Sequence, residues 1–86
     1  MINNTNITSD PIASEKIAIG RKIFFLDLKE NQRGRFVKIT EDVHGHRDTI
    51  MMPAEGLREF VAALGRIQHC EESLGEPAFA EYSESA

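Results

Sequence analysis

The stretch KIFFLDLKENQRGRFVKITED, residues 22–42, decides the fold of this 86-residue chain. Its first half predicts a strand over residues 23–29, because Phe24, Leu26 and Leu28 recur with a period of two. Side chains at alternate positions of a strand point to the same face, so these three form one apolar surface. The intervening positions and the one that follows hold an aromatic and two charged side chains, Phe25, Asp27 and Lys29, which therefore lie on the opposite face.

The second half of this stretch predicts a turn and another strand. Residues 30–34, ENQRG, combine polar side chains with a glycine, which tolerates a positive φ. Residues 35–40 alternate again, with Val37 and Ile39 on one face. Because the connection between the two strands is short, we expect them to form an antiparallel hairpin.

The sequence on either side of this hairpin predicts two more strands and a helix. Residues 15–19 and 48–52 are typical of strands, and residues 41–47 of a loop. Beyond the last strand the apolar period changes to three and four, which predicts a helix that ends near Cys70 or Leu74. Its apolar stripe consists of Leu57, Phe60, Val61, Leu64 and Ile67. We therefore expect an α+β fold of order ββββα, in which the helix stripe covers the apolar face of a four-stranded antiparallel sheet.

The opposite face of the predicted sheet carries two aromatic rings, Phe25 and Phe36, among cations. Asn31, Arg33 and Arg35 add polar and basic groups around the turn. An unpaired base stacks on such a ring for about 1–3 kcal/mol, and Lys or Arg neutralises phosphates. Because a duplex hides its base faces, this surface favours single strands. The pattern is equally typical of a sheet face that another protein subunit covers, so both interpretations stay open at this point.

Charge is distributed unevenly along the chain. The formal net charge is −4, yet residues 15–70 hold all ten Lys and Arg and only eight of the fourteen acids. Residues 1–13 are rich in Asn, Ser and Thr, and residues 76–86 are acidic. These compositions predict two flexible segments around one folded domain, residues 14–75. The net negative charge therefore does not exclude a nucleic-acid partner, because the local patch decides what binds.

Several other kinds of protein are not supported by the residues present. The chain has no run of about 18 apolar residues and does not begin like a secretory signal, so we expect a cytoplasmic protein, nucleoid-associated if it is bacterial. His44 and His46 do not fill a tetrahedral metal site, and neither a phosphate-cradling loop nor a pair of catalytic carboxylates occurs. Cys70 is the only cysteine, which excludes an intrachain disulfide. We expect no metal, no cofactor and no enzymatic activity.

The central stretch closely resembles the PUR repeat of the Pur-alpha family. The family pattern is an aromatic-rich strand that ends in Leu-Asp-hydrophobic-Lys, a basic turn with Asn, and then Gly-Arg-Phe-hydrophobic-Lys-hydrophobic, and all of it occurs between Lys22 and Asp42. Residues 13–19, 49–53 and 57–60 resemble the first strand, the fourth strand and the helix entry. The resemblance implies the ββββα PUR-repeat fold, related to Whirly proteins. Since this chain has one repeat, it also implies two copies intertwined as a homodimer.

The resemblance implies a function as well. Family members bind purine-rich single-stranded DNA and RNA, open duplexes locally and act as nucleic-acid regulators; the alternative is a protein–protein interaction module that uses the same aromatic face. The nucleic-acid-binding residues expected from pattern and resemblance together are Phe25, Lys29, Asn31, Arg33, Arg35, Phe36, Lys38 and Arg47. The family commonly has Tyr where this chain has Phe25, which can stack but cannot donate an O–H hydrogen bond. Arg47 follows the sequence EDVHGH, where many relatives are Gly-rich.

Overall fold

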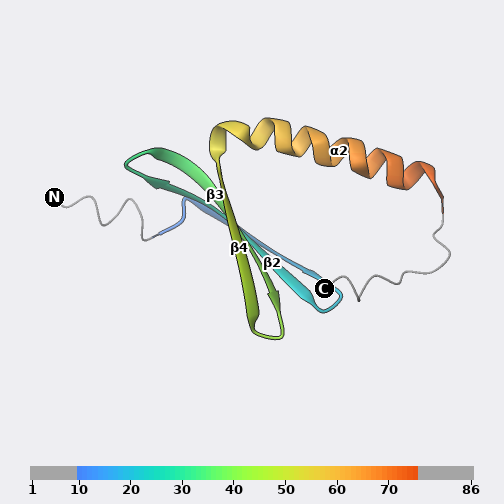
Figure 1. Ribbon diagram of the computed structural model, residues 1–86, viewed down its shortest axis with the longest axis horizontal. Coiled ribbons are helices and arrows are strands. Elements are labelled where there is room, and N and C mark those ends of the chain that lie inside the picture. The colour runs from blue at the N-terminus through green and yellow to red at the C-terminus, as the bar shows by residue number, and fades with distance from the viewer. Residues whose placement is uncertain (1–9, 76–86) are drawn as a thin grey trace.

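The computed structural model, which describes residues 10–75, contains four strands followed by one helix (Figure 1). The elements are β1 (Ala13–Ile19), β2 (Lys22–Asn31), β3 (Gly34–Val43), β4 (His46–Pro53), a 3₁₀ turn η1 (Ala54–Gly56) and the helix α2 (Leu57–Ser73). The strands form one antiparallel sheet in the order β1-β2-β3-β4. This architecture confirms the predicted α+β class and the ββββα order.

The strands are longer than predicted, and the predicted loop over residues 41–47 is wrong. Only His44 and Gly45 lie outside the strands there, because β3 continues to Val43 and β4 begins at His46. His44 has a φ of 54° and Gly45 a φ of 87°, so both adopt the left-handed region that a two-residue type I′ hairpin requires. The charged residues in this stretch had suggested a loop, whereas Glu41, Asp42 and Arg47 are strand positions.

The turn between β2 and β3 is equally short. The Asn31 side-chain oxygen accepts a hydrogen bond of 2.8 Å from the Arg33 N–H, and Gly34 has a φ of 127°. At the other end of the sheet, the Ile12 N–H donates to the Leu28 carbonyl at 2.7 Å, just before β1 begins at Ala13. The rest of the two predicted flexible segments, residues 1–9 and 76–86, lies outside the described residues.

Helix α2 does not cover its own sheet, which corrects the predicted packing. It runs away from the end of β4 instead of folding back (Figure 1). Its apolar stripe is open, with Leu64 54% and Ile67 67% exposed. The reason is local: the chain is helical from Ala54 onward, so no loop reverses its direction after Pro53. Nor is the helix long and apolar enough to cross a lipid bilayer.

The apolar face of the sheet is also incompletely covered within one chain. Cross-strand pairing places on this face Ile17, Ile19, Phe24, Leu26, Leu28, Val37, Ile39, Val43, Ile50 and Met52. Of these, Val37 alone is buried, and Ile50 is 60% exposed. The Cα radius of gyration is 16.1 Å, whereas a compact chain of this size has about 11–12 Å. A single copy therefore leaves most of its helix stripe exposed to solvent and its apolar sheet face only partly covered.

Candidate nucleic-acid interface

The sheet face opposite the apolar one is basic. Because directly paired residues share a face, the strand registers assign its side chains without ambiguity. Charged side chains on this basic face are Lys16, Lys29, Lys38, Arg47, Asp27 and Asp42, four cations against two acids. The apolar face carries Lys22, Arg35, Glu15, Glu30, Glu41 and Asp48, the reverse ratio. The two faces thus differ in charge as well as in hydrophobicity.

Phe36 lies at one end of the basic face, near the turn that joins β2 to β3. It pairs directly with Lys29 on β2 and with Pro53 on β4. Asn31 follows at the tip of the same hairpin, and its oxygen is engaged by the Arg33 N–H, which leaves the side-chain NH₂ available to donate. Lys38 is the next residue of β3 on this face, opposite Asp27. A half-buried ring, an amide donor and two ammonium groups are therefore adjacent.

The surface beside Phe36 is hollowed. A depression of about 410 Å³ has an apolar lining of Phe36, Met51, Met52 and Pro53, and its polar and charged lining residues are Asn31, Arg33, Arg35 and Glu55. The apolar members provide contact area for a planar group, and the polar members provide donors at its edge. A hollow of this size and composition can accept a nucleic-acid base.

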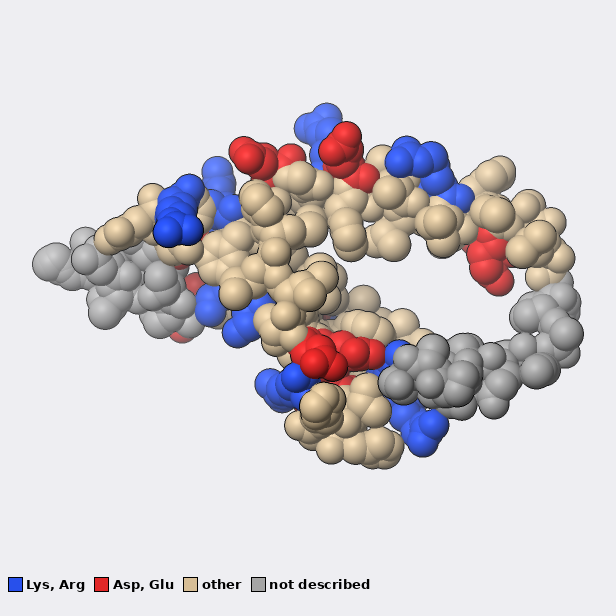
Figure 2. Space-filling view, in the orientation of Figure 1, with Lys and Arg blue, Asp and Glu red and all other residues tan. Residues whose placement is uncertain are grey.

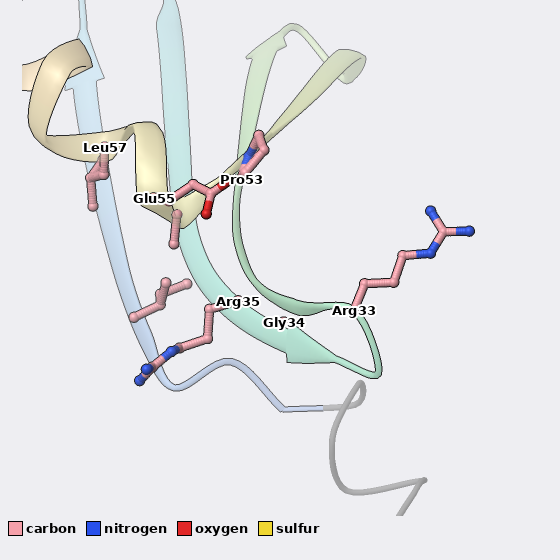
Figure 3. A pocket seen from close by; sticks show the side chains of 8 residues that line it. Arg33, Gly34, Arg35, Pro53, Glu55 and Leu57 are labelled. Carbon is pink, nitrogen blue, oxygen red and sulfur yellow. The ribbon is translucent and has the colours of Figure 1, made fainter.

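Arg35 lines the hollow beside Phe36, but the strand register places it on the face opposite Phe36. In the register it pairs with Glu30 and shares the apolar face with Val37. Figure 3 shows Arg33 and Arg35 extending in opposite directions from the hairpin tip, around a second depression of about 540 Å³ that also includes Glu55. The structure thus brings six of the eight predicted residues onto one face and Arg33 to its edge, while Arg35 lies on the other face.

Phe25, the second predicted ring, has two cations close to it. The Lys16 Nζ lies 5.8 Å from the ring centroid, and the Arg47 guanidinium carbon lies 5.1 Å from it. Both distances are within the range of a cation–π interaction. Thr40, opposite Phe25 in the register, is only 5% exposed, and its hydroxyl lies 3.3 Å from that of Thr49.

Asp42 holds Arg47 in this position. The Arg47 Nε donates to Asp42 Oδ2 at 2.8 Å, and the Gly45 N–H donates to Asp42 Oδ1 at 3.0 Å. The hydrogen bond from Arg47, followed by that from Gly45, lowers the pKa of the Asp42 carboxyl below its usual value. Asp42 therefore stays ionised at neutral pH and orients the Arg47 side chain across the sheet.

Lys16 is the site residue that the sequence prediction missed. It occurs in β1, 31 residues before Arg47, and looks like an ordinary exposed strand lysine. The pairing of Lys16 with Phe25 reveals its place on the basic face. Alternation along residues 13–19 could have assigned it to this face only if the register of β1 on β2 had been known. Among the described residues, no cluster of His, Cys, Asp and Glu could hold a metal ion.

An antiparallel sheet with stacking rings and cations on its open face is the surface that single-stranded nucleic-acid-binding proteins use. The family model described as PurA ssDNA and RNA-binding protein matches residues 2–86. The chain therefore belongs to the PurA family, which confirms the resemblance seen in the central stretch.

Individual relatives agree with this assignment. The chain is 36% identical over 61 residues to transcription factor Pur-alpha 1 of Arabidopsis thaliana, which covers 71% of this chain and 21% of that protein. It is 38% identical over 63 residues to the mouse transcriptional activator protein Pur-alpha, covering 65% of this chain and 20% of that protein. The human purine-rich element-binding protein gamma is 41% identical over 54 residues, 48% of this chain and 16% of that protein. The chain spans about a fifth of the length of these relatives.

Proposed function

We propose that this chain binds single-stranded DNA or RNA on its basic face and so acts as a nucleic-acid regulator. The observation that carries the proposal is the division of the sheet: both candidate rings and most strand cations share the face that the apolar side chains leave open. A protein-docking face would be expected to be depleted of charge at its centre, whereas Lys38 lies between the two rings. The charge pattern therefore supports nucleic acid over a protein partner.

The spacing of the two rings suits a strand that crosses the sheet. Thr40 pairs with Phe25, so the rings are four residues apart along β3, or about 13 Å. A base that enters the hollow beside Phe36 stacks on the ring and meets the Asn31 NH₂ at its edge, while the strand continues toward Phe25. Purine bases have the larger π surface, and one relative is named for purine-rich elements, which supports a purine-rich preference.

We further propose that the functional unit is a homodimer. In one chain the helix stripe is largely exposed and the apolar sheet face is partly exposed, and each has the chemistry to cover the other. In Figure 2, which has the orientation of Figure 1, most charged side chains of the helix lie along its outer side, and uncharged ones face the space above the sheet. Exchange of helices between two copies buries both apolar surfaces in one step.

We also propose local duplex opening, which the same geometry supports. The Phe36 ring can stack only on a base that has left its own stack, so the protein binds the open form of a duplex and not the closed one. Binding to one form shifts the equilibrium toward it by mass action. We therefore expect opening at sites where the base pairs of the duplex already open transiently.

The proposal is tested with a purine-rich single-stranded DNA oligonucleotide titrated by fluorescence anisotropy at two salt concentrations. We expect affinity to fall steeply with salt, because bound cations displace counterions. Phe36→Ala should weaken binding by about 1–3 kcal/mol through lost stacking. The matched control is Arg66→Ala, which lies opposite the apolar stripe of α2 and should leave affinity nearly unchanged. Equal binding by wild type and Phe36→Ala would refute the site.

A further inference from the structure

We propose that Lys16 and Arg47, held over the ring of Phe25, form a phosphate-binding site for the backbone of a single strand. Phe25 is then the support of this cation pair and not a platform for a base. The inference rests on the proposed function, since it divides the basic face into a base-binding end at Phe36 and a phosphate-binding end at Phe25. It adds Lys16 to the interface and gives Phe25 a role other than stacking.

The two rings have different surroundings. No cation–π contact to Phe36 occurs among the described residues, and an open hollow lies beside it. Phe25 has the Lys16 ammonium at 5.8 Å and the Arg47 guanidinium at 5.1 Å from its centroid. A base that stacked on Phe25 would have to displace charged groups that the ring itself attracts. Stacking is therefore disfavoured at Phe25 and favoured at Phe36.

The cations over Phe25 are well placed for an anion. Lys16 is exposed, and the Arg47 side chain is 60% exposed, so both present their charged groups to solvent. The two side chains come from opposite edge strands, β1 and β4, and converge on one ring. An aromatic ring beneath a cation restricts its motion, which reduces the conformational entropy lost when a phosphate binds.

Asp42 completes the site by orienting Arg47. Its Oδ2 receives one N–H of the guanidinium, at 2.8 Å, while the remaining N–H groups can donate to a phosphate oxygen. The carboxylate also repels the phosphate, so it limits affinity while it fixes geometry. Asp42→Asn keeps an acceptor for the Gly45 N–H and removes the negative charge; we expect it to bind the oligonucleotide more tightly at low salt.

The experiment measures Kd over a salt series for a purine-rich single-stranded DNA oligonucleotide and for the same oligonucleotide with abasic sites. Lys16→Gln and Arg47→Gln should each reduce the slope of log K against log salt by about 0.7, the value for one phosphate of a single strand. The ratio of affinities for the two oligonucleotides should not change, because no base contact is lost. Phe36→Leu should do the opposite, lowering the ratio and leaving the slope intact.

Phe25→Leu decides the role of the ring, since leucine retains apolar volume but offers no π face. We expect it to reduce the salt slope and leave the abasic ratio unchanged. A reduced ratio with an intact slope would make Phe25 a stacking platform and overturn the inference. Unchanged slopes in Lys16→Gln and Arg47→Gln would also overturn it. Failure of the proposed function would look different from failure of this inference. The wild type would then bind neither oligonucleotide.

Discussion

Phe25 and Phe36 show how neighbouring residues give one side chain two different roles. Both rings lie on the basic face of the same hairpin, and their sequence contexts are similar. Lys16 and Arg47 approach Phe25, whereas Phe36 borders an open hollow. The difference arises from partners on β1 and β4, which are remote in sequence. Residue identity alone therefore does not establish a binding role.

Asp42 makes the tip of the β3–β4 hairpin sensitive to acid. Its pKa is lowered in the folded chain, so it contributes stability that is complete above its unfolded pKa and is lost as the pH falls through the folded value. We expect the protection factor of the Gly45 amide, which corrects for the intrinsic pH dependence of exchange, to fall below a pH of about 4. Hydrogen exchange followed by NMR measures this. Asp42→Asn is the control and should abolish the dependence; an unchanged pH profile in that variant would contradict the assignment.

At the scale of elements, two-residue turns determine how the basic face is assembled. His44 and Gly45 reverse the chain so tightly that Asp42 pairs directly with Arg47. A longer loop would relax this register and separate Arg47 from Phe25. The positive φ of both turn residues is therefore a structural requirement of the site and not a feature of the loop alone.

A substitution at Gly45 tests this requirement. Its φ of 87° is one that L side chains rarely adopt, although no atom lies within 4 Å of an added Cβ. Gly45→Ala should therefore destabilise the fold by about 1 kcal/mol through backbone strain. Gly45→Asn should cost less, because Asn tolerates the left-handed region better. Urea denaturation measures both, and an alanine variant as stable as wild type would show that the turn is not strained.

At the scale of the whole molecule, one copy does not form a closed core. Val37 is the only buried apolar side chain among the described residues, while Phe60, Val61, Leu64 and Ile67 are 40–67% exposed. A soluble monomer rarely exposes an apolar surface of this extent. This exposure supports the proposed exchange of helices between two copies.

The dimer is tested by placing a charge on the helix stripe. We expect the wild type to have the mass of two chains by light scattering at micromolar concentration. Leu64→Glu buries an unpaired carboxylate in the exchanged interface and should abolish the dimer together with most of its cooperative unfolding. Arg66→Glu places the same carboxylate on the opposite side of α2 and should retain the dimer. A single-chain mass for the wild type would refute the homodimer.

The sequence predicted the strands and the helix better than it predicted the contacts between them. Alternation identified the apolar face through Phe24, Leu26 and Leu28, and the same alternation separated Phe25 and Phe36 from them. It missed the full lengths of β3 and β4, because charged residues near a glycine resemble a loop. It also grouped Arg35 with the turn cations, although its odd-numbered position on β3 matches Val37 and Ile39.

By itself, the sequence determined the order ββββα, the two faces of the hairpin and membership of a family, because these depend on local periodicity and on a contiguous motif. Only the tertiary structure decided that Lys16 and Arg47 meet at Phe25 and that α2 leaves its own sheet. Such contacts depend on strand register and on the direction that the backbone takes after a turn. Both are set by a few backbone dihedrals, and a small change in them moves distant side chains by many ångströms.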